Sequence, residues 1–284
     1  AAMMLRRIAI EKTSSLLDHL FWARHEFSHS HLPNWCNHLL FSVRPPWERM
    51  VRTSFSDFPG VKIDFAALTE DSVERADLVV PLEFSDLQWL ADRPDLVRSK
   101  PIRVPSRMLV ELCHDKPAFN AAVRDLGFSD LIPSMEWPLA YPYIVKPSRG
   151  ENSNDTFVIR TASDEVAHAD VLMDTGSFRQ EMLSGPIEYA THMAIRDGKV
   201  LAELTIEYRF EGQYPVKGAD RFVRRAVSCP DTELLANVLR ALGYEGLCCF
   251  NYKMPRGKIK LIELNPRFGG SLAPHFKNFL AMME

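Results

Sequence analysis

The chain has 284 residues, 46% of them hydrophobic and 25% charged, which is long enough to bury a sizeable core in one or two compact lobes. Its formal net charge of −3 at pH 7 argues against a basic surface for nucleic acid or for an anionic membrane. Its apolar runs fall short of the roughly 18–20 residues that span a bilayer, and residues 1–12 lack the apolar stretch of a secretory signal. We therefore expect neither a nucleic-acid nor a membrane partner.

The first hundred residues alternate helical and strand-like segments. Spacing of apolar residues predicts helices over 15–27 and 84–91 and a short strand over 78–81. Proline is dense from Pro94 to Pro105, which predicts a boundary between two lobes.

The middle of the chain predicts strands around a polar loop and one helix. A helix begins after Asp115, which can cap it, carries Pro117 in its first turn and ends at Gly127. The next predicted elements are strands over 143–146 and 156–160, a helix over 164–173 and a strand over 177–183.

The last hundred residues predict two hairpins separated by a helix. The first hairpin pairs 189–196 with 199–208 around Asp197-Gly198. A helix over 231–242 stops at Gly243. The second hairpin pairs 246–253 with 258–264.

The end of the last predicted strand carries groups that a stable strand does not need. Glu263, Asn265 and Arg267 alternate, so they lie on one side of an extended chain. Asn251 lies 12 residues before Glu263, and the hairpin makes the two cross-strand neighbours. Oxygen ligands suit Mg²⁺, and an arginine stabilises negative charge on a phosphoryl group. The alternative is a surface hairpin with ordinary turn residues.

Two lysines favour the metal and phosphate interpretation. Lys146 closes the strand YPYIVK before a polar loop, and Lys116 begins the helix after the proline-rich boundary. Such lysines can neutralise phosphate oxygens while backbone amides of the loop cover them. The segment QEMLSGPIEY then offers a backbone for a purine edge through residues 180–183, and Glu188 for a ribose hydroxyl.

The order of the HDK helix, the YPYIVKPS loop, QEMLSGPIEY, CCFNYK and KLIELNPRFGGS resembles the ATP-grasp superfamily. The similar branch contains carbamoyl-phosphate synthetase, biotin carboxylase and D-alanine–D-alanine ligase, and the resemblance covers residues 105–275. It implies an α/β (α+β) ATP-grasp fold: a Rossmann-like N-terminal lobe (1–104), a small lid subdomain (105–183) and a C-terminal subdomain with the metal site (184–284).

The resemblance also implies roles for individual residues. Lys116 and Lys146 would contact ATP phosphates beneath a lid of residues 148–155, which includes Ser148 and Gly150. Adenine would meet Glu181 and Leu183, and Glu188 would reach the ribose. The metal ligands would be Glu263, Asn265 and Asn251. Arg267 would be catalytic, stabilising an acyl phosphate and the tetrahedral state that follows.

Three departures from the family pattern concern this site. Asn251 stands where many members have Glu or Asp, so one metal position is weakened. The lid has a single glycine, Gly150, where several are usual, and Arg149 could add a phosphate contact. One extra residue separates Gly185 from Glu188, which makes the ribose contact less secure.

A His- and Cys-containing stretch, residues 25–38, comes before this region. His25 and His29 would share a helix face, and Cys36 and His38 follow, so a zinc site is conceivable. The second pair lacks finger spacing, and we expect packing and surface histidines instead. The five cysteines form no CxxC pair and have an odd count, which suits a reducing cytoplasm.

A basic segment follows the first hairpin and includes Arg209 and Arg221. Composition alone predicts a solvated loop. Within an ATP-grasp fold, we expect Lys217 and Arg224 or Arg225 to touch phosphate or a substrate carboxylate. His275 would either line an acceptor pocket or cap the final helix. Cys248 and Cys249 would pack as small apolar side chains.

The leading hypothesis is an ATP- and Mg²⁺-dependent carboxylate–amine ligase, with Mn²⁺ as a substitute metal. It would act on small molecules such as amino acids or peptides, in the cytoplasm, and could form a homodimer. The chain ends soon after the metal strand, so we expect no carrier, transferase or second synthetase half. Two alternatives stay open: a kinase-like or non-amine acyl transfer, and a nucleotide-binding pseudoenzyme or regulatory protein.

Overall fold

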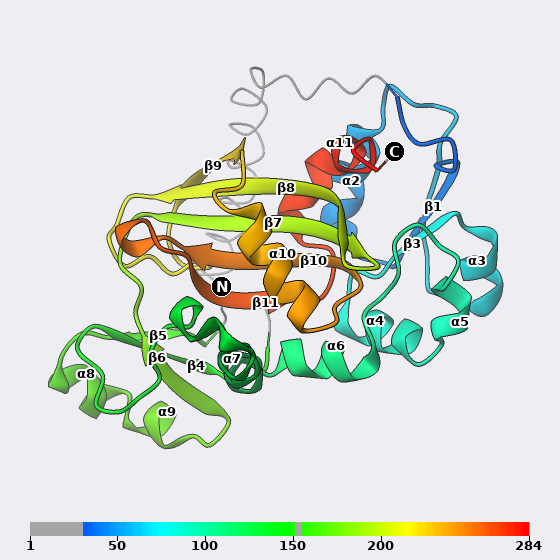
Figure 1. Ribbon diagram of the computed structural model, residues 1–284. Helices are drawn as coiled ribbons and strands as arrows, with labels where there is room; N and C mark the ends of the chain where they lie inside the picture. Colours follow the sequence, from blue (N-terminus) through cyan, green and yellow to red (C-terminus); the bar gives the residue numbers. More distant parts are fainter. Residues whose placement is uncertain (1–30, 151–154, 284) are drawn as a thin grey trace.

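The computed structural model describes residues 31–150 and 155–283, and the helix predicted over 15–27 lies outside them. A three-stranded parallel sheet in the order β2-β1-β3 opens the described chain (Figure 1). Its strands are β1 (His38–Phe41), β2 (Lys62–Phe65) and β3 (Leu78–Val80), and its helices are α2 (Pro45–Ser54), α3 (Glu70–Arg75), α4 (Phe84–Ala91) and α5 (Pro94–Val97). The strand and helix predicted over 78–81 and 84–91 are confirmed. The Rossmann-like character of this lobe stays a prediction.

A small antiparallel sheet in the order β5-β4-β6 forms a separate body at one end of the molecule (Figure 1). Its strands are β4 (Tyr143–Pro147), β5 (Phe157–Ile159) and β6 (Ser177–Glu181), with helices α8 (Ala162–Ala167) and α9 (Ala169–Met173). The predicted helix over 164–173 is in fact two helices, because the backbone leaves helical geometry at His168. It begins earlier than predicted because Thr161 and Asp164 form a capping box.

The largest sheet is antiparallel, with the order β11-β10-β7-β8-β9. Its strands are β7 (Ile187–Arg196), β8 (Lys199–Phe210), β9 (Phe222–Val227), β10 (Gly246–Lys253) and β11 (Lys260–Asn265). Both predicted hairpins are confirmed, and Asp197 and Gly198 turn the first with φ of 51° and 72°. The basic segment, expected as a loop, contributes β9 as an edge strand.

The large sheet is covered on both faces (Figure 1). One face packs against α6 (Arg107–His114), α7 (Lys116–Val123) and α10 (Thr232–Ala241) through a core that includes Phe119, Leu239 and Phe250. The other face packs against the N-terminal lobe and against η4 (Gly270–His275) and α11 (Phe276–Leu280), through a core that includes Phe41, Ile206 and Phe276. Short turns complete the chain at η1 (Arg124–Phe128), η2 (Ser129–Leu131) and η3 (Pro255–Gly257).

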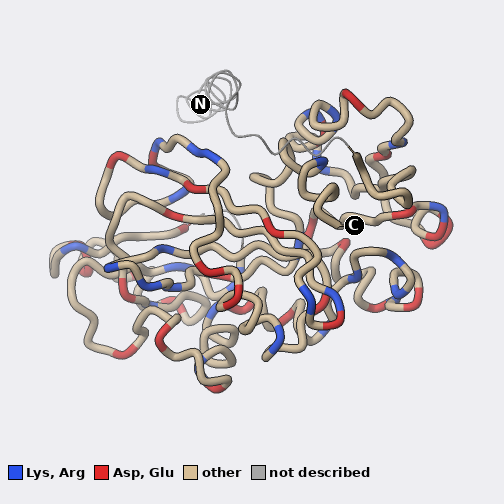
Figure 2. The backbone as a smooth tube through the Cα atoms, turned by 45° about the horizontal axis from the view of Figure 1, so that its top comes forward, with Lys and Arg blue, Asp and Glu red and all other residues tan. Residues whose placement is uncertain are grey.

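The three sheets have cores of very different size. The small sheet's core consists of Tyr143, Val145 and Ile159 with a few partly buried neighbours, while the cores on the two faces of the large sheet are each several times larger. Acidic and basic residues are interspersed along the backbone (Figure 2). Within the described part of the chain, no helix is long and apolar enough to cross a membrane.

Candidate active site

The hairpin of β10 and β11 brings the predicted metal ligands together. Asn251 lies directly opposite Glu263, and Cys249 opposite Asn265, so the predicted cross-strand pairing is confirmed. The Asn265 amide nitrogen donates a hydrogen bond of 2.9 Å to Oε1 of Glu263. This contact turns the amide oxygen of Asn265 away from the carboxylate and leaves it available as a ligand.

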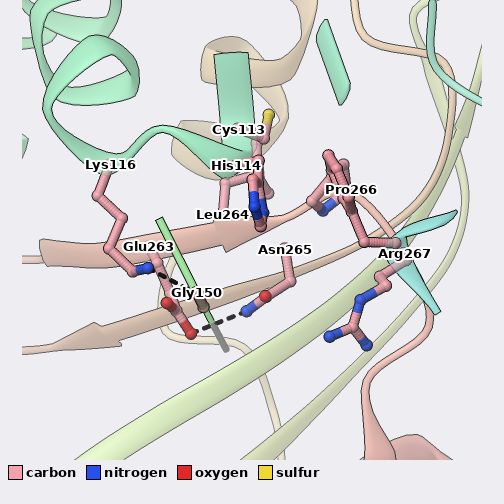
Figure 3. Close-up of a pocket in the computed structure, with 10 residues that line it drawn as sticks. Cys113, His114, Lys116, Gly150, Glu263, Leu264, Asn265, Pro266 and Arg267 are labelled. Carbon is pink, nitrogen blue, oxygen red and sulfur yellow. Dashed lines mark hydrogen bonds between the residues drawn. The ribbon is translucent and has the colours of Figure 1, made fainter. Parts of the chain in front are cut away.

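A pocket opens at the end of β11 (Figure 3). It is lined by Glu263, Asn265 and Arg267 together with Phe84, Cys113, His114, Lys116, Gly150, Leu264 and Pro266. Arg267 is only 8% exposed, and its guanidinium donates to the Phe268 carbonyl. An almost fully buried guanidinium beside a carboxylate and an amide is suited to an anionic ligand.

Five residues of this pocket were not predicted from the sequence, namely Phe84, Cys113, His114, Leu264 and Pro266. Phe84 begins α4 just beyond the carboxyl end of β3, and its ring stacks on His114 with centroids 3.9 Å apart. Ligands of open parallel sheets gather beyond the carboxyl ends of strands. That rule was the available signal for Phe84, whereas nothing in the sequence indicated its contact with α6.

Lys146 lies near the end of β4 and is a buried ammonium. It is 7% exposed, and its Nζ lies 5.2 Å from the ring centroid of Phe178 on β6. The pKa of Lys146 is lowered to about 8: burial is the main cause and the neighbouring Lys116 adds to it, while the carboxylates of Glu263 and Glu188 oppose it. The small sheet therefore places the Lys146 ammonium near the carboxylates of Glu263 and Glu188 on the large sheet.

Lys116 ties the start of the predicted lid to α7. Its Nζ donates to the Gly150 carbonyl at 2.9 Å, and its backbone N–H donates to the Ser148 carbonyl at 2.9 Å. Arg149 contacts Asp115, the N-cap of α7, at 3.3 Å. The structure thus places Lys116, Ser148 and Gly150 together, as expected, whereas residues 151–154 of the predicted lid lie outside the described residues.

The segment predicted for adenine links the small sheet to the large one. Both the carboxylate and the backbone N–H of Glu181 bond to Ser134. Beyond β6, the carbonyls of Leu183 and Gly185 accept hydrogen bonds of 3.1 and 2.9 Å from Nζ of Lys253. Lys253 was not expected in the site, yet its two hydrogen bonds hold the backbone of this linker in place.

Glu188 and Lys217 form an ion pair at the centre of the site. Glu188 is 6% exposed, and its Oε1 accepts from Nζ of Lys217 at 3.1 Å and from the Asn251 amide at 3.3 Å. The Lys217 ammonium also lies 3.8 Å from the ring centroid of Tyr208. Burial alone would lower the pKa of Lys217, but interactions with Tyr208, Glu188 and Cys249 raise it above its ordinary value.

The two neighbouring arginines of β9 point in opposite directions. Arg224 is paired with Tyr208, which is paired with Glu188, so these three lie on the same face. Arg225 is paired with Glu207 on the opposite face and bonds to its carboxylate at 3.2 Å. Of the two arginines expected at phosphate or substrate, the geometry brings only Arg224 to the face of Glu188.

A buried polar row continues from Asn251 along the same face. The Cys249 thiol lies 3.4 Å from the Asn251 amide oxygen and 3.9 Å from Nε2 of His192, which bonds to the Ser271 hydroxyl at 2.8 Å. Burial raises the pKa of Cys249 to about 12 and lowers that of His192 to about 3. Both side chains are therefore neutral at pH 7.

His275 lies near this row, because its charge helps to lower the pKa of His192, whereas His38 lies on β1. Burial and Arg224 lower the pKa of His275 to about 4, and its side chain makes no capping hydrogen bond to α11. His38 bonds to Asp64 at 2.9 Å, while His25 and His29 lie outside the described residues. Among residues 31–150 and 155–283, no three His, Cys, Asp or Glu side chains are grouped to hold a metal.

The N-terminal lobe packs against the loop that follows Arg267. The indole of Trp47 lies so close to Gly270 that an added Cβ would come within 2.8 Å of it. Trp47 also contacts Phe268, and the Arg44 guanidinium lies 4.0 Å from its ring centroid. Gly270 therefore has no room for a side chain.

Solved structures match this arrangement across most of the chain. D-Ala:D-Ser ligase VanG from Enterococcus faecalis matches with a TM-score of 0.60 and 15% identity, over 87% of this chain and 97% of its own. An L-amino acid ligase from Bacillus licheniformis matches with a TM-score of 0.57 and 17% identity, over 87% and 73%. Both are ATP-grasp enzymes. The chain has the ATP-grasp fold.

A third match to the ATP-grasp fold carries a nucleotide. D-alanine–D-alanine ligase from Bacillus anthracis, complexed with ATP, has a TM-score of 0.55 and 12% identity, over 87% of this chain and 94% of its own. No model of a protein family matches the sequence, and no curated protein matches it either. The structural neighbours are thus ATP-dependent ligases that form carbon–nitrogen bonds. Their similarity to this chain establishes its fold.

Proposed function

We propose that this ATP-grasp protein is an ATP- and Mg²⁺-dependent carboxylate–amine ligase. The observation that carries the proposal is the buried Lys146 ammonium of the small sheet. Its charged form is stabilised by the carboxylate of Glu263, which belongs to the large sheet. A buried lysine whose strongest favourable partner is a pocket carboxylate on another sheet is costly unless a ligand uses both charges. ATP with a divalent cation is such a ligand.

The nucleotide would lie between the small sheet and the hairpin of β10 and β11. Adenine would follow the linker at Glu181 and Leu183, whose course Lys253 supports. Lys146 and Lys116 would receive the phosphates beneath Ser148 and Gly150, with Arg224 near the outer phosphate or a substrate carboxylate. The contact of Glu188 with a ribose hydroxyl stays a prediction, since Lys217 and Asn251 already occupy one of its oxygens.

The donor set at the end of β11 fits Mg²⁺, with Mn²⁺ as a substitute. Glu263 keeps one carboxylate oxygen outside its bond to Asn265, and the Asn265 amide oxygen faces away from that bond. Few protein ligands are what Mg²⁺ takes at nucleotide sites, where water and phosphate oxygens complete its shell. When bound, the ion would neutralise charge on the transferring phosphoryl group.

The reaction would proceed in two displacements at this site. A carboxylate oxygen of the first substrate attacks the terminal phosphorus of ATP, so that ADP leaves and an acyl phosphate forms. The amine nitrogen of the second substrate then attacks the acyl carbon, loses a proton and expels phosphate. Arg267, buried at the pocket, would hold the acyl phosphate and the oxyanion of the tetrahedral state. The substrates would be small molecules.

Phosphate release from ATP and Mg²⁺, measured across a panel of amino acids and other carboxylates, tests this proposal together with product mass. We expect activity with at least one carboxylate–amine pair, and a fall of about 100-fold or more in kcat for Glu263→Gln and for Arg267→Met. The exposed Glu233→Gln serves as the matched control. An unchanged kcat in Glu263→Gln would show that Glu263 is not a ligand of the metal ion.

The alternative of a nucleotide-binding regulatory protein rests on Asn251 and on the glycine-poor lid. It predicts that ATP raises the melting temperature while no substrate pair releases phosphate. A kinase-like or non-amine acyl transfer predicts phosphorylated or non-amide products in the same assay. The buried charges of Lys146 and Arg267 favour turnover, because binding alone does not require a buried guanidinium beside the metal ligands.

A further inference from the structure

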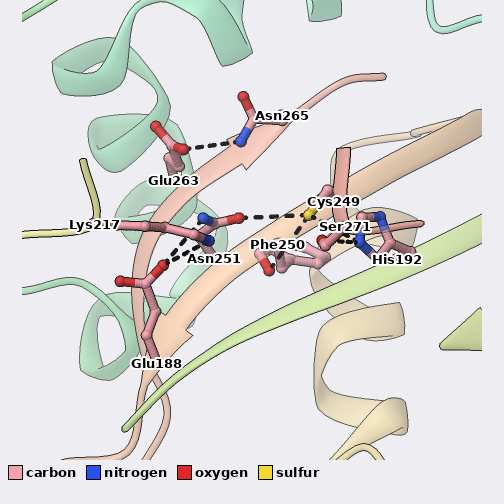
Figure 4. Close-up of polar contacts among 9 residues, drawn as sticks. All are labelled: Glu188, His192, Lys217, Cys249, Phe250, Asn251, Glu263, Asn265 and Ser271. Carbon is pink, nitrogen blue, oxygen red and sulfur yellow. Dashed lines mark hydrogen bonds and ion pairs between the residues drawn. The ribbon is translucent and has the colours of Figure 1, made fainter. Parts of the chain in front are cut away.

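The amide of Asn251 is held by two neighbours of its own face (Figure 4). Its nitrogen lies 3.3 Å from Oε1 of Glu188, and its oxygen lies 3.4 Å from the Cys249 thiol. Glu263 lies opposite on β11, but the hydrogen bond of Glu263 goes to Asn265. Figure 4 shows the Glu263–Asn265 pair and the Glu188–Asn251–Cys249 row as two separate sets of contacts.

Chemistry decides which end of the Asn251 amide faces Glu188. A carboxylate only accepts hydrogen bonds, so the atom beside Glu188 must be the amide nitrogen. The oxygen then faces the Cys249 thiol, which lies 3.4 Å away and donates to it. The only metal-binding atom of Asn251 is thus directed toward a donor and away from Glu188.

Lys217 brings a permanent charge to the same place. Its Nζ and the Asn251 amide share Oε1 of Glu188, at 3.1 and 3.3 Å. The ammonium is also held over Tyr208 at 3.8 Å. The carboxylate beside Asn251 is thus already paired with a cation.

The charges around the pocket also oppose a second divalent cation. Six cationic side chains lie around the two carboxylates Glu188 and Glu263, namely Lys116, Lys146, Lys217, Lys253, Arg224 and Arg267, an excess of four positive charges. ATP carries about four negative charges at neutral pH, close to two on its terminal phosphate and about one on each of the other two. A second divalent cation would therefore add about two positive charges to a site that the first already leaves positive.

We propose that the nucleotide is bound with a single divalent cation, held by Glu263 and Asn265, and that Lys217 supplies the charge of a second. Asn251 is then a positioning residue: it holds Glu188, which in turn holds Lys217, and it does not bind the metal. This inference rests on the proposed nucleotide site and makes that site's metal requirement specific.

Mn²⁺ binding to the full chain, saturated with a non-hydrolysable ATP analogue, tests the proposal by electron paramagnetic resonance and calorimetry. We expect one Mn²⁺ per bound nucleotide, and two would overturn the inference. Analogue binding is first measured alone. If the analogue does not bind, the proposed function itself fails and this inference fails with it, whereas two bound Mn²⁺ ions leave the proposed function intact.

Variants at three residues separate a ligand from a positioning residue. Glu263→Gln should weaken Mn²⁺ binding to the nucleotide complex about 100-fold, while Asn251→Ala should keep the Mn²⁺ affinity within about threefold and lower analogue affinity about tenfold. Lys217→Met should lower analogue affinity about 10- to 100-fold, Lys217→Arg should restore most of it, and the exposed Lys199→Met is the control. Circular dichroism checks folding. Loss of Mn²⁺ in Asn251→Ala, with analogue still bound, would show that Asn251 is a ligand.

Discussion

Lys146 is almost completely buried. The carboxylates of Glu263 and Glu188 favour its charged form, and the ammonium of Lys116 opposes it. The pKa of Lys146 falls from 10.5 to about 8, first because of desolvation. The group is therefore protonated below about pH 8 and loses its charge as the pH rises through that value. Since phosphate oxygens require the ammonium form, nucleotide affinity should fall on the alkaline side.

We predict that ATP affinity declines on the order of tenfold between pH 7.5 and 9.5, because the fraction of charged Lys146 falls over that interval. Lys146→Arg, which keeps its charge throughout, should give a nearly flat profile. Calorimetric titration at each pH measures both. A flat profile for the unaltered protein would show that Lys146 does not bind the phosphates.

At the residue scale, a contact between two site residues could be predicted only when the two residues are close in sequence. The pairing of Asn251 with Glu263 followed from a 12-residue hairpin, and the structure confirms it. The pairing of Glu188 with Lys217 joins a strand to a long loop, and no local pattern indicates it. The opposite orientation of Arg224 and Arg225 could not be predicted either, because it required knowing that their segment is strand β9.

At the scale of elements, the linker after β6 depends on a strand from the other sheet. Lys253 on β10 is 3% exposed and donates to the Leu183 and Gly185 carbonyls. Its replacement leaves two carbonyls without their charged donor. Elements with strong turn or cap signals, such as the β7–β8 hairpin, were predicted closely, whereas this support between elements was not.

We predict that Lys253→Met lowers the free energy of unfolding by about 3 kcal/mol or more, since each of its two charged hydrogen bonds contributes about 1.5–3 kcal/mol. It should also speed hydrogen exchange of amides 182–186. The exposed Lys258→Met serves as the control and should change neither quantity measurably. Urea denaturation and hydrogen-exchange mass spectrometry provide the measurements, and unchanged exchange at 182–186 would contradict the support assigned to Lys253.

For the whole molecule, the uneven cores predict uneven local stability. The small sheet has only Tyr143, Val145 and Ile159 as its fully buried centre, so it should open more readily than the large sheet. We predict faster amide exchange in β4–β6 than in β7, β8 and β10. Addition of ATP and Mg²⁺ should slow exchange in β4, which carries Lys146. Equal exchange in both sheets, or no protection of β4, would contradict this expectation.

The contact of Trp47 with Gly270 bears on how this architecture could be re-engineered. Exchanging the lobe that precedes the large sheet would treat that lobe as an independent module. Here the indole occupies the space that any Cβ at position 270 would need, three residues beyond Arg267. A grafted lobe that lacks an aromatic side chain at this point would leave the arginine loop without its brace, so the two parts must be exchanged together.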